Sequence, residues 1–173
     1  TLALMIVGQF MALVAVTIVN VALPTMQSDL HASGAALQLV VSGYTISYAM
    51  LLITGARLGD MRGPKPLFQI GLLTLTPSTL LCGISPNVGV LLAARFVQGA
   101  GAAAMVPQLF SVIQRQFTGA AKLRALGLYT ATLALGSAVG QVGGGLLVTS
   151  NVFGLTWRSV FLVNVPIGAV LAV

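Results

Sequence analysis

The chain has 173 residues, of which 57% are hydrophobic and only 6% are charged, and its mean hydropathy is +1.03. These values lie far outside the range of soluble globular domains and indicate an integral membrane protein. The formal net charge of +6 does not indicate a nucleic-acid partner, because the basic residues are confined to short loops between apolar segments, where contact with anionic lipid accounts for them.

Five apolar segments have the length that a hydrocarbon core requires, about 20 residues, and a sixth is shorter. We predict transmembrane helices at residues 2–23, 39–56, 67–84, 88–113, 125–148 and 159–173. The sixth is incomplete at Val173 and the chain opens on Thr1 instead of Met, so we expect a fragment of a longer protein. The first segment has no basic leader and is followed by further spans, so we expect no cleaved signal peptide.

Charge distribution between the loops predicts the orientation in the membrane. Six basic residues fall between the second and third segments or between the fourth and fifth: Arg57, Arg62, Lys65, Arg115, Lys122 and Arg124. The loops at the opposite end contain only one Lys or Arg, which is Arg158. Because Lys and Arg collect in cytoplasmic loops, we predict a multi-pass protein of the plasma membrane with a cytoplasmic N-terminus.

Side chains suited to catalysis or metal binding are scarce. The single cysteine, Cys82, lies inside an apolar segment, the single histidine is His31 in a loop, and the only carboxylates are Asp29 and Asp60. An enzyme needs a nucleophile with its base or a set of metal ligands. We therefore predict no enzyme, no catalytic residue, no metal site and no cofactor.

Several motifs follow one another in an order that carries a family resemblance. They read TIVNVALP at 17–24, GARLGDMRGPK at 55–65, LAARFVQGAGAA at 92–103 and WRSVFLVNVP at 157–166, with five glycines in the fifth segment at positions 127, 136, 140, 144 and 145. Together they resemble the major facilitator superfamily, and within it the fourteen-helix drug:proton antiporter branch. The resemblance covers essentially the whole chain.

The resemblance implies an all-α integral membrane fold in which residues 1–173 form the N-terminal six-helix bundle, with the sixth helix truncated and a C-terminal half missing. It also implies alternating-access efflux of a small-molecule substrate, a drug or metabolite, coupled to protons. Where the family has an acid in the first segment, however, this chain has Ala15. An uncoupled or differently coupled facilitator of the same fold, or a fragment that does not transport, therefore remains an alternative.

Polar residues inside the apolar segments are the candidates for the substrate or proton pathway. Arg95 is the only charged residue inside a segment, and such a charge is expensive in lipid unless it faces water or a partner, so we expect a functional role for it, the alternative being a structural arginine. At 1.5 Å per residue, Arg95 and Ala15 both lie about 10–12 Å from the outer ends of their segments, hence level with each other. Five further candidates provide either interhelical hydrogen bonds or substrate contacts: Gln98, Asn20, Thr17, Tyr44 and Gln141.

Two other groups of residues receive roles from the resemblance. The gating loop comprises Asp60, Arg57, Arg62, Gly63 and Lys65; its acid docks on a helix end or a nearby base in one state, and the alternative is a solvated charge cluster. The second group is the glycines of the fifth segment, all of which we predict to serve helix packing: Gly127, Gly136, Gly140, Gly144 and Gly145. Those at 136, 140 and 144 share one helix face, so we expect close helix packing there.

Overall fold

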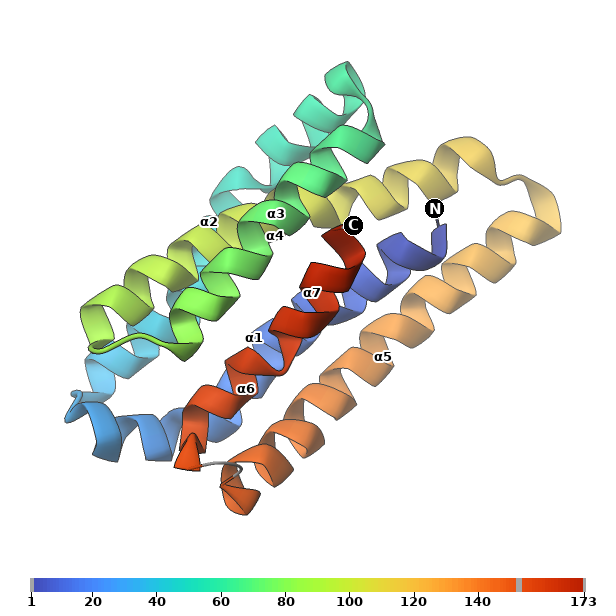
Figure 1. Cartoon of the computed structure of the whole chain (residues 1–173). Coiled ribbons are helices and arrows are strands. Elements are labelled where there is room, and N and C mark those ends of the chain that lie inside the picture. The colour runs from blue at the N-terminus through green and yellow to red at the C-terminus, as the bar shows by residue number, and fades with distance from the viewer. Residues whose placement is uncertain (1, 152–153, 173) are drawn as a thin grey trace.

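The computed structural model describes residues 2–151 and 154–172, and within these ranges it contains helices and no strands. The elements are α1 (Leu2–Leu30), α2 (Gly34–Arg62), α3 (Pro64–Gly83), α4 (Val88–Gln116), α5 (Gly119–Ser150), the 3₁₀ helix η2 (Thr156–Arg158), α6 (Ser159–Leu162) and α7 (Asn164–Ala172) (Figure 1). Helices α1 to α5 are each long and apolar enough to cross a membrane. The prediction of an all-α membrane fold is confirmed.

The predicted helix bounds 2–23, 39–56, 88–113 and 125–148 were too short, and 67–84 was displaced. The length of an apolar segment indicates only the part of a helix that lies in the hydrocarbon core. The helix itself continues beyond that part until a cap or a turn ends it. Ser33 accepts a hydrogen bond from Ala36 N at 3.2 Å and so starts α2. Gly63, with φ of 90°, ends α2, and Pro64 begins α3 immediately afterwards.

The sixth predicted helix, 159–173, begins at Ser159 as predicted but is not continuous. It is preceded by η2 and is interrupted at Val163, between α6 and α7. Pro166 has no N–H to donate to the carbonyl of Leu162, which accounts for the break. Val173, the predicted end of this helix, lies outside the described residues.

Helix α4 is the centre of the bundle. Both α2 and α3 pack extensively against it, while α1 packs mainly on α5, and α7 lies on α3 and α1 (Figure 1). If α1, α2 and α3 are exchanged with α4, α5 and the α6/α7 segment, respectively, the α1–α5 pair becomes the α4–α2 pair. Such a correspondence is expected of two repeated three-helix units. This arrangement brings α1, α2, α3 and α4 close enough to share one polar layer.

Two glycines of the LAARFVQGAGAA motif explain how α4 fits between its neighbours. A Cβ at Gly99 would lie 3.0 Å from the Cβ of Ser47 on α2, and a Cβ at Gly101 would lie 2.8 Å from the backbone nitrogen of Leu75 on α3. Neither position accepts a larger residue without moving a helix. In addition, the Ser47 hydroxyl donates to the carbonyl of Phe96 at 2.7 Å, which joins α2 to α4 at the same level.

Candidate functional site

A fully buried arginine lies in the middle of the bundle. The side chain of Arg95 on α4 is 0% exposed. Its Nε donates to the carbonyl of Val40 on α2 at 3.2 Å, and its Nη1 donates to the carbonyl of Ala15 on α1 at 3.0 Å. Nη1 also donates to Oε1 of Gln98, one turn along α4, at 2.6 Å. The prediction that residue 15 lies level with Arg95 is confirmed.

The hydrogen bonds of Arg95 continue into a third neighbouring helix. Nε2 of Gln98 donates to Oγ1 of Thr79 on α3 at 2.7 Å, and that hydroxyl donates to the carbonyl of Leu75 at 2.7 Å. Arg95, Gln98 and Thr79 therefore form a continuous polar layer that touches α1, α2, α3 and α4. The layer lies between two apolar clusters, one on each side along the bundle.

Tyr44 covers the guanidinium of Arg95. The guanidinium carbon lies 4.7 Å from the centre of the Tyr44 ring, and the Tyr44 hydroxyl donates to the carbonyl of Ala12 at 3.4 Å. Carbonyl dipoles and the face of an aromatic ring thus surround the charge, which is an arrangement that stabilises a cation. One nitrogen, Nη2 of Arg95, has no hydrogen-bond partner among the described residues.

Neither carboxylate of the chain is near this charge. Asp60 pairs with Arg115 at one end of the bundle, and Asp29 pairs with Arg158 at the other. Since the sequence contains only two acidic residues, the polar layer has a net positive charge within this chain. Backbone carbonyls accept the hydrogen bonds that a carboxylate at position 15 would otherwise have accepted from Arg95.

The other predicted pathway residues are only partly assembled here. The structure brings Gln98 and Tyr44 to Arg95, whereas Asn20 and Gln141 are exposed. Thr17 is partly buried and donates to the carbonyl of Leu13 in its own helix at 3.1 Å. Position 141 follows Gly140, which faces α1, so the helical turn of about 100° per residue directs Gln141 away from that contact.

Beside Tyr44, a cavity of about 300 Å³ opens where α1, α2, α4 and α5 meet. Its lining is mainly apolar and aromatic: Gln9, Ala12, Leu13, Val16, Tyr44, Thr45, Tyr48, Val106, Tyr129 and Leu133. We call it the tyrosine cavity. Gln9 and Tyr129 had not been predicted from the sequence, since Gln9 is a lone amide in an apolar run and Tyr129 lies outside every motif.

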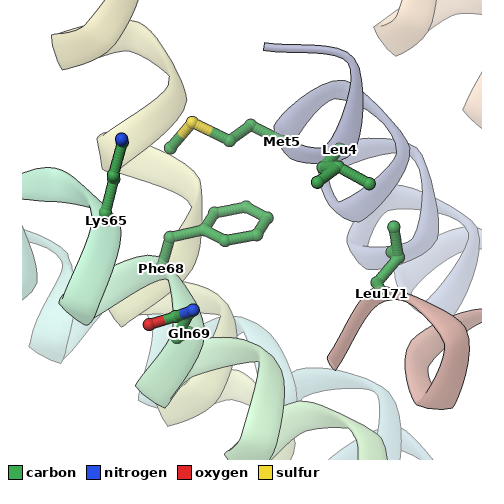
Figure 2. A pocket seen from close by; sticks show the side chains of 6 residues that line it. All are labelled: Leu4, Met5, Lys65, Phe68, Gln69 and Leu171. Atoms are coloured by element: carbon green, nitrogen blue, oxygen red, sulfur yellow. The ribbon is translucent and has the colours of Figure 1, made fainter. Parts of the chain in front are cut away.

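A second cavity, of about 190 Å³, lies between α1, α3 and α7. Figure 2 shows the Phe68 ring projecting from α3 toward Leu4 and Met5 of α1. Lys65 and Gln69 supply its polar lining, so one member of the predicted gating loop also borders an apolar cavity near the end of the bundle.

The acid of the predicted gating loop docks on a residue outside that loop. Oδ1 of Asp60 lies 2.6 Å from Nη2 of Arg115 in the last turn of α4, with both side chains more than half exposed. Arg57, Arg62 and Lys65 do not pair with it. Gln108, two turns before Arg115, donates to the carbonyl of Gly55 at 3.0 Å. This α2–α4 contact sets the alignment that lets Arg115 reach Asp60.

At the opposite end, a cluster around Asp29 and Arg158 joins three separate parts of the chain. Oδ2 of Asp29 accepts hydrogen bonds from Nε1 of Trp157 at 2.8 Å and from Nη1 of Arg158 at 2.6 Å. The Arg158 guanidinium also lies 4.4 Å from the Trp157 ring centre and donates to the carbonyl of Ser85 at 3.4 Å. This cluster ties the end of α1 to the α3–α4 connection and to η2.

The glycines of α5 divide into two groups. A Cβ at Gly136 would lie 3.1 Å from Leu13, and one at Gly144 would lie 2.6 Å from Ile18, while Gly140 faces Thr17 and Val14, so these three glycines lie directly on α1. A Cβ at Gly145 would only touch Val21, at 3.6 Å, and Gly127 has no heavy atom near it within the described residues. The prediction of close packing therefore fails for Gly127 in this bundle.

Comparison with known proteins agrees with this architecture. The Major Facilitator Superfamily profile matches residues 5–173. The chain is 38% identical over 166 residues to the probable actinorhodin transporter of Streptomyces coelicolor, covering 96% of this chain and 29% of that protein. It is 39% identical to the cephamycin export protein CmcT of Amycolatopsis lactamdurans, covering 96% of this chain and 34% of the relative. It is 37% identical to the multidrug resistance protein Stp of Mycobacterium tuberculosis, covering 94% and 30%, respectively. The chain thus spans about a third of the length of these relatives, and it belongs to the Major Facilitator Superfamily.

Proposed function

We propose that the chain is the N-terminal bundle of an efflux transporter that moves a small molecule across the plasma membrane by alternating access. The buried polar layer around Arg95 carries this proposal, because a charge buried among membrane-spanning helices is expensive and by default indicates a substrate or ion pathway. The names of the relatives, which include export and resistance proteins, support export as the direction. The missing part of the transporter supplies the other side of the pathway, and the role is transport and not catalysis.

Coupling to protons is part of this proposal, and Ala15 favours one alternative to it. The charge of Arg95 is met by the carbonyls of Ala15 and Val40 and not by a carboxylate that could exchange a proton. Proton coupling therefore requires an acid from the rest of the transporter. The second candidate is a facilitator of the same fold that is uncoupled or coupled to something other than protons.

Replacing Arg95 with Lys in the full-length transporter tests the main proposal. An ammonium group cannot reach both the Val40 carbonyl and the Ala15 carbonyl as the planar guanidinium does, and each charged hydrogen bond contributes about 1.5–3 kcal/mol. We expect export into everted vesicles to fall at least about tenfold while membrane expression is kept. Export at the parental rate would contradict the role of Arg95.

A protonophore tests proton coupling in the parental transporter. Loss of export on adding the protonophore supports proton coupling, whereas an unaffected rate favours the facilitator.

Asp60 and Arg115 are proposed to act as the latch of the gating loop. An exposed ion pair contributes at most about 1 kcal/mol, so it is weak enough to open and close during each cycle. We expect Asp60→Asn to slow export severalfold and the exchanged pair Asp60→Arg with Arg115→Asp to recover most of the rate. Arg124→Gln, which removes a basic residue from the same end, is the control and should stay near the parental rate. Equal rates in parent and Asp60→Asn would leave only a solvated charge cluster.

The orientation is also a proposal, based on the positive-inside distribution of Lys and Arg. It places the α2–α3 and α4–α5 connections in the cytoplasm together with the N-terminus. After Cys82 is replaced by Ser, a membrane-impermeant thiol reagent added to intact cells should label a cysteine at Asn87 and not one at Ala120. Labelling of Ala120 alone would reverse the orientation.

A further inference from the structure

The tyrosine cavity has features that select a ligand by charge, and nothing in its lining is acidic. Tyr44 belongs both to the cavity wall and to the polar layer, since the Arg95 guanidinium lies 4.7 Å from its ring centre. Ala12, whose carbonyl accepts a hydrogen bond from the Tyr44 hydroxyl, also lines the cavity. The cation of Arg95 thus lies directly behind one wall of the cavity, and neither carboxylate of the chain lines it.

The shape and chemistry of the wall favour an aromatic ligand. The rings of Tyr44 and Tyr48 are nearly parallel, at 12° with centres 6.4 Å apart, and Tyr129 adds a third ring from α5. Tyr48 and Tyr129 are partly exposed, and their flat aromatic surfaces can stack on the ring system of a ligand, whereas Tyr44 is buried. A volume of about 300 Å³ is at the low end for small-molecule sites and is enough for one ring system. The rest of the transporter would contact the remainder of the ligand.

Gln9 provides the polar contact. Its side chain is 5% exposed and lines the cavity, and Oε1 has no hydrogen-bond donor among the described residues. Oε1 is itself covered in this structure, so a hydroxyl or amine of a ligand pairs with it once the Gln9 side chain rotates toward the cavity, which removes the cost of an unpaired buried oxygen. This amide is neutral, and it offers no counter-charge to a cationic ligand.

From these contacts we infer that the tyrosine cavity binds an aromatic substrate that is anionic or neutral and that carries a hydrogen-bond donor, in preference to a cationic drug. The inference rests on the proposed function and specifies its substrate class. The positive charge behind Tyr44 disfavours a cation and favours an anion, while stacking and the Gln9 amide hold a ring that bears a hydroxyl or amine.

Binding to the purified full-length transporter in nanodiscs tests this inference with two fluorescent aromatic probes of opposite charge. Anilinonaphthalenesulfonate is the anion, with an N–H donor, and ethidium is the cation; empty nanodiscs correct for partition into lipid. We expect the sulfonate to bind on the order of tenfold more tightly than ethidium. Gln9→Glu, which puts a carboxylate into the cavity at almost unchanged volume, should reduce this preference at least about tenfold.

Gln27→Glu is the matched control, because Gln27 lies on the same helix, is exposed and does not line the cavity. It should keep the parental preference. Tighter binding of ethidium by the parent, no binding of the sulfonate, or the same preference in parent and Gln9→Glu would overturn the inference. Uptake of the sulfonate by everted vesicles distinguishes the ligand class from the proposed transport: selective binding without uptake would contradict transport and leave the assigned ligand class standing.

Discussion

A guanidinium that is fully buried and has no acidic partner within the chain determines how the centre of this bundle is built. Arg95 brings the carbonyls of Val40 and Ala15, on two different helices, within hydrogen-bond distance of one side chain. Through Gln98 it also engages Thr79 on a third helix. Because leaving any of these groups unpaired in a lipid environment is costly, the four helices are held at one mutual alignment. The glycines at 99 and 101 permit this alignment by letting α4 approach α2 and α3 closely.

The two ends of the bundle are connected in different ways, and the difference bears on the proposed cycle. At one end a single exposed ion pair links α2 to α4. At the other, Asp29 accepts from both Trp157 and Arg158, and Trp157 is fully buried. A lone exposed pair separates easily, whereas a cluster that includes a buried indole is expected to persist. The proposed movement is therefore easier at the Asp60–Arg115 end.

Much of this architecture was accessible from the sequence, because the relevant signals are local. Apolar length indicates the spans, and the position of Arg95 along its segment correctly predicts that it lies level with residue 15. Contacts between distant residues are different, since they depend on how helices pack. Nothing in the loop 55–65 specifies that Asp60 meets Arg115 instead of a base nearby in sequence. Likewise, Gln9 becomes a candidate ligand contact only because Tyr44 and Tyr129, on two other helices, line the same cavity.

Within this bundle, backbone carbonyls and a glutamine amide, not an acid, hold the Arg95 guanidinium. Nuclear magnetic resonance of the arginine side-chain nitrogens in the full-length transporter tests it directly, with the Arg95 signals assigned from their loss in Arg95→Lys. We expect two separate Nη signals and an Nε proton that exchanges slowly with water, because Nε and Nη1 are hydrogen-bonded and the whole side chain is buried. A single averaged Nη signal with rapid exchange would show a mobile, hydrated guanidinium and would rule out this hydrogen-bonded arrangement.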